Sequence, residues 1–210
     1  MVTFVIIRHG FSKSNKEKKF AGQADIPLDE IGVMQAEKTA EYVLKNYKID
    51  AIYSSDLSRA YNTAKPIADA LNLPIIAQKN LRELNLGYWQ GKTHEEVQKE
   101  FPESYRIMKE NPSLTVFDGG ESYMDGKERA LKTIAEIAGE NDGKTVLIAS
   151  HGAFIRSLLW GLTGVDSVSK TVDVLNASVT VLNYDKGNAE ILLSGYNKHL
   201  DEKMSQVKVY

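Results

Sequence analysis

Two histidines stand in matching positions, each at the end of a short apolar run. His9 and Gly10 close the segment "FVIIRHG", and His151 and Gly152 close "TVLIASHG", in a chain that has four histidines. An imidazole can attack as a nucleophile, transfer a proton or donate a hydrogen bond to an anion. Either histidine alone could be a structural residue, but two in the same context favour a shared site. The glycines suit places where the backbone turns tightly or approaches a ligand.

Two arginines accompany the histidines. Arg8 directly precedes His9, and Arg59 lies in "SSDLSRAYNTA", in the first turn of a predicted helix. A helix N-terminus disfavours cations and attracts anions, so an arginine there indicates a bound anion. Pairing of Arg59 with Asp56 is the alternative. Since guanidinium groups match phosphate oxygens in geometry and charge, the residues together predict a phosphate-handling site.

The elements that must position these residues alternate along the chain. Short apolar runs predict strands, and the amphipathic stretches between them predict helices. The predicted strands cover residues 3–7, 50–55, 74–78 and 144–150, and the predicted helices cover residues 29–47, 56–72, 122–138 and 152–164. This order predicts an α/β fold of three layers, a mostly parallel sheet with helices on both faces. Residues 178–185 and 189–196 predict a C-terminal hairpin that adds an antiparallel strand.

The topology brings the two histidines together, because ligands of parallel sheets bind at the carboxyl ends of the strands. Residues 1–200 are expected to form one domain, with residues 84–120 as an inserted cap of loops and short helices and 201–210 as a charged tail. The apolar residues of the cap either roof a pocket or form the cap's own small core; they are Tyr88, Trp89, Phe101, Tyr105, Met108 and Phe117.

Composition narrows the choice of partners. Lys plus Arg number 26 against 28 Asp plus Glu, a net charge of -2, so no general attraction to nucleic acid or to a membrane is expected. The chain has no cysteine and no apolar run long enough to cross a membrane, which favours a cytoplasmic protein. The histidines lack metal-ligand spacing, so neither a metal nor a cofactor is expected. A homodimer is left open.

Four segments in order, "RHGFSKSN", "SSDLSRAYNTA", "LRELNLGYWQG" and "SHG", resemble the histidine phosphatase superfamily, in its phosphoglycerate-mutase-like branch. The resemblance covers residues 4 to about 160. It implies that His9 is the nucleophile that takes the phosphoryl group, with Arg8, Arg59 and His151 around the phosphoryl oxygens. It also implies a set of residues that border or hydrogen-bond the substrate, namely Ser12, Asn15, Ala21, Gly22 and Gly152.

An acid is implied by the resemblance alone. The leaving alkoxide needs a proton, and the family motif "RELNLGYWQG" assigns that role to Glu83, which would later activate the hydrolytic water. The residues by themselves do not choose Glu83 over Glu95, Glu96 or Glu121. The remaining histidines, His94 and His199, are expected at the surface or in the cap.

The resemblance leaves three functions open. In mutases that use bisphosphoglycerate, the acid is followed by a segment like Arg-His-Tyr-Gly and the second His-Gly by Asn, whereas here Glu83 is followed by "LNLGYWQG" and Gly152 by Ala153. These differences favour a metal-independent hydrolase of small-molecule phosphomonoesters. The alternatives are a bisphosphoglycerate-dependent phosphoglycerate mutase and a catalytically weak phosphate-binding regulatory module. The five filled catalytic positions argue against the regulatory module.

Overall fold

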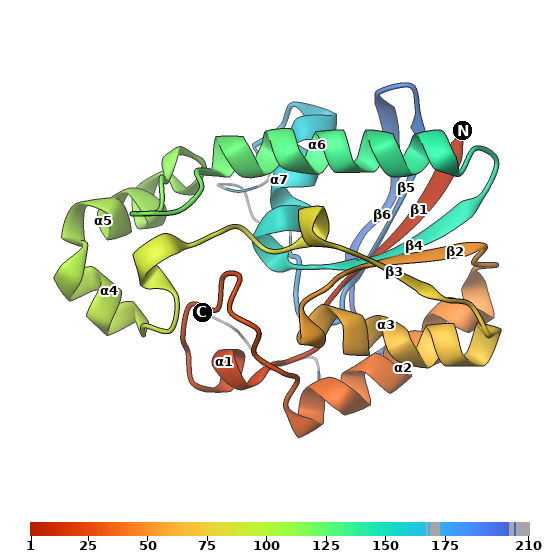
Figure 1. The fold of residues 1–210 in the computed structure, drawn as a ribbon, viewed down its shortest axis with the longest axis horizontal. Coiled ribbons are helices and arrows are strands. Elements are labelled where there is room, and N and C mark those ends of the chain that lie inside the picture. Colours follow the sequence, from red (N-terminus) through yellow and green to blue (C-terminus); the bar gives the residue numbers. More distant parts are fainter. Residues whose placement is uncertain (167, 169–172, 202–203, 205–210) are drawn as a thin grey trace.

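A six-stranded sheet forms the centre of the protein (Figure 1). The computed structural model describes residues 1–166, 168, 173–201 and 204. The order of strands across the sheet is β3-β2-β4-β1-β5-β6. The strands are β1 (Val2–Arg8), β2 (Ala51–Ser55), β3 (Ile75–Gln78), β4 (Thr145–Ser150), β5 (Val179–Asp185) and β6 (Asn188–Tyr196). The first four strands run parallel, and the β5–β6 hairpin joins β1 in antiparallel fashion, as the sequence predicts.

The sheet is covered on both faces, which confirms the three predicted layers. The side chains of β1 alternate: Val5 and Ile7 belong to the apolar cluster that includes residues of α2 and α3, whereas Phe4 and Ile6 belong to the cluster that includes residues of α6 and α7. The helices are α2 (Glu30–Asn46), α3 (Ser58–Leu71), α6 (Tyr123–Glu140) and α7 (Gly152–Thr163). Figure 1 shows these two helix pairs on opposite sides of the sheet.

Short helices fill the connections. They are α1 (Lys13–Lys16), α4 (His94–Glu100) and α5 (Pro102–Glu110), with the single 3-10 turns η1 (Lys79–Leu81), η2 (Gly87–Trp89) and η3 (Pro112–Leu114). Figure 1 places α4 and α5 together at one end of the molecule. Within the described residues, no helix is both long and apolar enough to cross a membrane. The cellular location and the absence of nucleic-acid partners stay predictions.

The predicted cap region has an apolar cluster of its own, centred on the fully buried Trp89. The Trp89 indole donates to Asp118 over 3.1 Å, and its ring lies edge-on to Phe117. Phe117 and Met108 also line the pocket described below, so the cap residues include both core and pocket wall. Tyr88, in contrast, is 66% exposed and does neither. The proposed domain bounds stay a prediction, and of the expected tail only Asp201 and Met204 lie in the described residues.

Gly10 allows a helix to approach the end of β1. A Cβ on Gly10 would lie 2.5 Å from the carbonyl oxygen of Gly32 in α2, and a Cβ on Gly32 would lie 2.0 Å from the carbonyl oxygen of Phe11. Both distances are too short for any side chain. The expected close approach at Gly10 is therefore to the backbone of α2 rather than to a ligand, and Gly10 does not line the pocket.

Glycine-to-alanine substitutions at a crowded and at an open helical position should have opposite effects on stability. Gly32→Ala should lower the free energy of unfolding by about 1–3 kcal/mol or more, because the backbone of Phe11 must move. Gly139→Ala in α6 meets nothing within 4 Å and should raise it by about 0.5–1 kcal/mol. Denaturant titrations of both variants measure these changes, and an unchanged stability for Gly32→Ala would contradict the close packing.

Candidate active site

The register of β1 and β4 places the two histidines side by side. Arg8 pairs with Ser150 in the parallel ladder, and the backbone N–H of His9 donates to the Ser150 carbonyl oxygen over 2.9 Å. Each strand therefore ends at the same edge, and the next residue of each is a histidine. The ring centroids of His9 and His151 are 5.2 Å apart, which confirms that the repeated strand ending marks one location.

The hydrogen bond of His9 defines its tautomer. Its Nδ1 lies 2.7 Å from the carbonyl oxygen of Gly10, which can only accept, so Nδ1 carries the proton. In the neutral ring, Nε2 then holds a lone pair, and no described residue hydrogen-bonds to it. Burial, with the charges of Arg59 and Arg8, holds the pKa of His9 well below its ordinary value of 6.5. His9 therefore presents a neutral ring with a lone pair available for nucleophilic attack.

Three side chains hold the backbone around His9 in place. The Asn176 amide donates to the carbonyl oxygens of His9 and Gly10 over 3.0 and 3.2 Å. The hydroxyl of Thr63 accepts from the Gly10 N–H, and the Gln35 side chain accepts from the next N–H. Sequence reasoning missed Asn176, because it precedes β5 and is far from His9 along the chain.

Arg8 and Arg59 are oriented by carbonyl oxygens, not by carboxylates. Arg8 donates to the Val174 carbonyl oxygen over 2.7 Å, and Arg59 donates to those of Gly22 and Ala24 over 2.7 and 2.8 Å. The Nε of each arginine is buried and has no hydrogen-bond partner in the part of the chain that the structure describes. Desolvation lowers the pKa of each to about 10, so both remain charged at neutral pH.

The alternative partner of Arg59 is engaged elsewhere. Asp56 forms a two-pronged ion pair with Arg82, at 2.6 Å for both contacts. Arg59 is the second residue of α3, in the first turn as the sequence predicts, and is 1% exposed. The charge of Arg59 therefore remains unpaired within the described residues and is available for an anion.

His151 is completely buried beside His9 and is not itself part of the pocket wall, and neither of its ring nitrogens has a hydrogen-bond partner among the described residues. Desolvation and the charge of Arg59 hold the pKa of His151 well below 6.5, so its ring is neutral. A neutral imidazole has one N–H donor, and a buried donor without an acceptor is costly unless a ligand supplies one. This arrangement fits a donor to a phosphoryl oxygen.

Asn15 lines the pocket, and its neighbours fix which end of the amide faces inward. Its Oδ1 accepts from the backbone N–H and the hydroxyl of Ser12, over 3.0 and 2.9 Å, and from Asn176 over 3.1 Å. These contacts leave the Nδ2 donors unused. Ser12 is fully buried and does not line the pocket, so it positions Asn15, and the hydroxyl that lines the pocket belongs to Ser14.

The small residues expected at the site line the pocket. Ala21, Gly22 and Gly152 are all part of its wall. Gly22 adopts a positive φ of 52°, which favours glycine and turns its carbonyl oxygen toward Arg59. A Cβ on Gly152 would lie 3.3 Å from the Arg8 Nε, so its glycine leaves room for the guanidinium.

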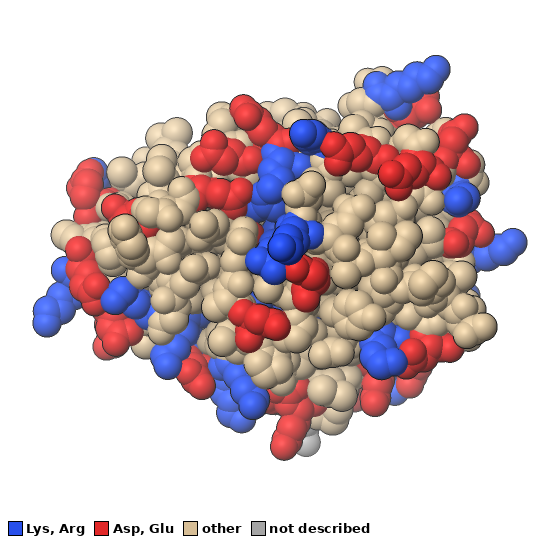
Figure 2. All heavy atoms as spheres, in the orientation of Figure 1, with Lys and Arg blue, Asp and Glu red and all other residues tan. Residues whose placement is uncertain are grey.

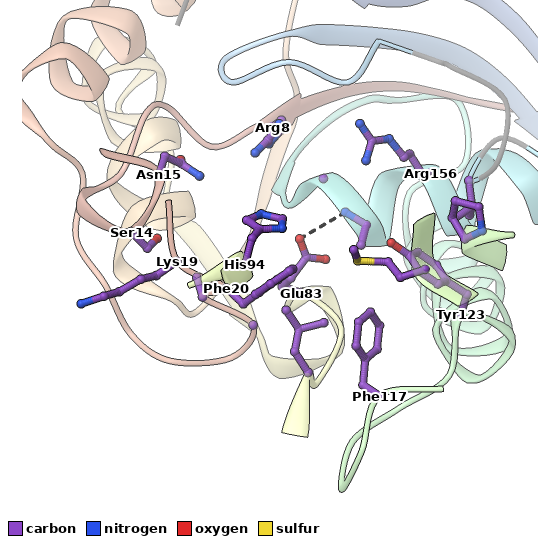
Figure 3. Close-up of a pocket in the computed structure, with 18 of the residues that line it drawn as sticks. Arg8, Ser14, Asn15, Lys19, Phe20, Glu83, His94, Phe117, Tyr123 and Arg156 are labelled. Carbon is purple, nitrogen blue, oxygen red and sulfur yellow. Dashed lines mark hydrogen bonds between the residues drawn. The ribbon is translucent and has the colours of Figure 1, made fainter. Parts of the chain in front are cut away.

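Glu83 joins the site by contacts with the first turn of α7. One carboxylate oxygen accepts from the N–H of Phe154 over 2.9 Å, and the other accepts from the N–H of Ala153 over 3.1 Å. The Leu84 N–H donates to the first oxygen as well. These backbone donors fix the carboxylate inside the pocket (Figure 3). Of the four candidate acids in the sequence, Glu83 is the one that lines the pocket.

A second acid supports the segment that carries Glu83. Glu121 pairs with Arg129 over 2.8 Å and also accepts from the Asn85 N–H over 2.6 Å. Arg129 in turn donates to the carbonyl oxygens of Asn80, Arg82 and Glu83. This network ties residues 80–85 to α6.

The pocket encloses about 380 Å³, a volume suited to a small molecule. Sequence reasoning missed six polar residues of its wall, which are Ser14, Lys19, His94, Lys109, Tyr123 and Arg156. His94 lies on a cap helix, as expected, and also lines the pocket, where the centroid of its ring is 4.3 Å from that of Phe20 and the two rings are tilted by 46°. The position of Arg156 one helical turn after Gly152 was a signal that could have identified it. His199 lies elsewhere and hydrogen-bonds to Thr39.

These side chains supply what phosphoryl transfer requires: a nucleophile, donors around it and a carboxyl group nearby. Within the described residues, no three His, Asp or Glu side chains gather closely enough to hold a metal ion. Figure 2 shows basic and acidic residues interspersed over the visible face. The pocket, in contrast, is lined by five Lys or Arg residues and by one acid, Glu83, among the described residues.

Comparison with known proteins agrees with this chemistry. The model of the histidine phosphatase superfamily (branch 1) matches residues 4–197. Phosphoserine phosphatase 1 of Hydrogenobacter thermophilus is 34% identical over 204 residues, which cover 96% of each chain. Phosphoglycerate mutase-like protein 4 of Arabidopsis thaliana is 34% identical over 201 residues, which cover 94% of this chain and 86% of that protein.

The fold is also similar to solved structures. The structure of Bacillus stearothermophilus YhfR has a TM-score of 0.88 and 30% identity, and the match covers 95% of this chain and 99% of that one. The family match extends over nearly the whole sheet and includes both strand ends that carry histidine. The chain therefore belongs to the histidine phosphatase superfamily and is a phosphatase of that type.

Proposed function

We propose that the protein hydrolyses small-molecule phosphomonoesters without a metal ion, through a phosphorylated His9. The observation that carries this proposal is the state of His9, a neutral ring whose Nδ1 donates to a carbonyl oxygen while Nε2 keeps its lone pair. The ring of His151 lies beside it, and the charges of Arg8 and Arg59 act on it. Each of these three residues has a buried nitrogen without a hydrogen-bond partner among the described residues. A relative is named phosphoserine phosphatase, which makes phosphoserine one candidate substrate.

In the first step, the Nε2 lone pair attacks phosphorus and the bond from phosphorus to the ester oxygen breaks. The electrons of that bond pass to the leaving oxygen, which takes a proton from the carboxyl group of Glu83 and departs as an alcohol. The guanidinium groups of Arg8 and Arg59 stabilise the negative charge on the three phosphoryl oxygens. The proton stays on Nδ1 throughout and donates to the Gly10 carbonyl oxygen.

In the second step, water attacks the phosphorus of phosphorylated His9 and gives a proton to the Glu83 carboxylate. The bond from phosphorus to Nε2 breaks, the electron pair returns to the ring, and inorganic phosphate leaves. Glu83 is then protonated for the next cycle. A mutase would instead pass the phosphoryl group to a second hydroxyl, which is the main alternative outcome.

In this proposal the guanidinium groups of Arg8 and Arg59 balance the negative charge of the phosphoryl group, a role that a metal ion can also fill. Arg8 and Arg59 both remain charged and keep buried N–H donors without acceptors. Their carbonyl partners orient them but carry no net charge to offset theirs. The site can therefore bind a phosphate dianion with side chains alone.

The proposal predicts the behaviour of His9→Ala. The wild type should release inorganic phosphate from p-nitrophenyl phosphate, sugar phosphates or phosphoserine, with activity unchanged by EDTA. His9→Ala should lose at least about a thousandfold in kcat, because the nucleophile is gone. It should also lose the acid-labile, base-stable phosphoenzyme. Phosphoenzyme that persists in His9→Ala would reject the nucleophile assignment, and interconversion of phosphoglycerates without hydrolysis would favour a mutase.

The acid role predicts a dependence on the leaving group for Glu83→Gln. The rate of phosphorylation of His9, measured in single turnovers, should fall about 100-fold or more with alkyl phosphates, whose leaving oxygen needs a proton. It should fall much less with p-nitrophenyl phosphate, because p-nitrophenolate departs without one. Equal losses with both substrates would show that Glu83 is not the proton donor.

The neutral histidines predict a pH dependence of folding stability. Because the folded pKa values of His9 and His151 are held well below 6.5, the unfolded chain binds more protons below about pH 6.5. The free energy of unfolding must then fall with falling pH, by up to about 1.4 kcal/mol per pH unit for each histidine.

His151→Gln tests this contribution, since it removes one of the two groups. Between pH 7 and 5, its free energy of unfolding should decline less steeply than that of the wild type. The two slopes should differ by up to about 1.4 kcal/mol per pH unit, the contribution of one histidine. Urea titrations at each pH provide the measurement. Parallel curves for the two proteins would mean that His151 is not held neutral in the fold.

A further inference from the structure

Arg156 faces the active site but has no part in the proposed reaction. It lies in α7 one turn after Gly152, and it lines the pocket. Figure 3 shows its guanidinium near Arg8, on the opposite side of Glu83 from Ser14 and Lys19. The Arg156 charge is the second largest cause of the lowered pKa of Arg8, after desolvation. A further cation beside the phosphoryl site therefore requires an explanation.

Arg156 has no hydrogen-bond acceptor among the described residues, unlike the other five arginines. Arg8 and Arg59 donate to carbonyl oxygens, and Arg82, Arg106 and Arg129 form ion pairs with carboxylates. In the part of the chain that the structure describes, no carbonyl or carboxylate oxygen accepts from Arg156. Arg156 is half-buried, and a guanidinium has five N–H donors and no acceptor, so its donors are open to water or to the acceptor oxygens of a bound ligand.

Tyr123 presents a second unused donor next to Arg156. It is the first residue of α6, it is only 8% exposed, and its ring packs against Phe117 at 5.8 Å. Its hydroxyl donates to no described residue, although the side chain lines the pocket. Burial raises the pKa of Tyr123 to about 12, so the phenol keeps its proton, and the charge of Arg156 acts on it in the opposite direction.

The pocket carries more positive charge than one phosphoryl group and Glu83 require. Its basic lining residues are Arg8, Lys19, Arg59, Lys109 and Arg156, whereas Glu83 is the one acid among the described lining residues. Lys19 pairs with Glu17, so its charge is partly offset. Arg156 forms no ion pair with a carboxylate of the described residues. A second negative charge on the ligand would balance the Arg156 charge.

The rest of the wall suits a short carbon skeleton. Leu86, Met108 and Phe117 give apolar surface, and the pocket volume of about 380 Å³ fits a small molecule. Guanidinium donors in a planar fork match the two oxygens of a carboxylate, and the Tyr123 hydroxyl can add a third donor. A polymer or a large aromatic ester would not use these contacts.

We infer that Arg156 and Tyr123 bind a carboxylate on the alcohol part of the substrate. The preferred substrates are then phosphomonoesters of small hydroxy acids or hydroxyamino acids, with the phosphoryl group at His9 and the carboxylate at Arg156. This inference rests on the proposed hydrolase function, and it assigns Arg156 to substrate selection instead of to the phosphoryl oxygens.

Two matched substrate pairs test it. O-phosphoserine and O-phosphoethanolamine differ in one carboxylate, and 3-phosphoglycerate and glycerol 1-phosphate differ in a carboxylate against a hydroxymethyl group. The wild type should have a higher kcat/KM for the carboxylate member of at least one pair. Arg156→Gln should lower that kcat/KM by about tenfold or more, as expected for a lost charge-assisted hydrogen bond, and change the other member less than threefold.

Tyr123→Phe should reduce the same preference by a smaller factor, and Arg156→Lys should restore part of it. The ratio within a pair does not depend on the fraction of folded enzyme, so it remains valid if a variant is less stable. Arg106→Gln is the matched control, because Arg106 is exposed on α5 and pairs with Glu103 and Glu110; it should leave both ratios unchanged.

Two results would overturn the inference while the proposed function stands: a wild type without preference in either pair, or an equal loss for both members in Arg156→Gln. The equal loss would place Arg156 at the phosphoryl group. Failure of the proposed function has a different signature, since the wild type would then hydrolyse no ester, p-nitrophenyl phosphate included. In that case calorimetric binding of phosphoserine and phosphoethanolamine would still test the carboxylate site, with equal affinities rejecting it.

Discussion

The rest of the site depends on one electrostatic constraint, which is that two desolvated guanidinium groups are held together without carboxylate partners. Burial removes part of the hydration that stabilises both charges, and for Arg8 the charges of Arg156 and Arg59 add repulsion. Desolvation lowers the pKa values of Arg8 and Arg59 to about 10, and both side chains still keep their charge at neutral pH. Burial, and after it the charge of Arg59, lowers the pKa of both neighbouring histidines, so they stay neutral, which is the state that a nucleophile and a hydrogen-bond donor need.

The choice of partners separates the arginines that bind ligand from those that build structure. Arg82 and Arg129 pair with Asp56 and Glu121, which cancels their charge and fixes the segment around Glu83. Arg8 and Arg59 donate to backbone carbonyl oxygens instead, which fixes their direction while the full charge remains. A carbonyl dipole thus provides orientation without neutralisation, and the anion that completes the site must come from outside the chain.

The sequence predicted the parts of the site that depend on local structure. His9 and His151 follow strands of recognisable pattern, and the parallel register then brings them together. Arg59 was identified by its place at a helix start. Asn176 and Tyr123 had no such signal, because their contacts with the site cross long stretches of chain. Ser12 matched the expected motif, yet the geometry of its short helix turns its hydroxyl toward Asn15 and leaves Ser14 at the pocket wall.

Glu83 illustrates why a loop residue is difficult to assign from the residues alone. The Glu83 carboxylate is held by the N–H groups of Ala153 and Phe154, which are distant in sequence. The Glu83 backbone carbonyl oxygen accepts a hydrogen bond from Arg129. The same turn of α7 follows His151, so one helix start orients the acid while the strand before it supplies a histidine. The strand ends carry Arg8, His9 and His151, whereas Arg59, Tyr123 and Arg156 reach the pocket from helices. The two residues inferred to select the alcohol therefore lie outside the parallel strand pair that sets the distance between the two imidazoles.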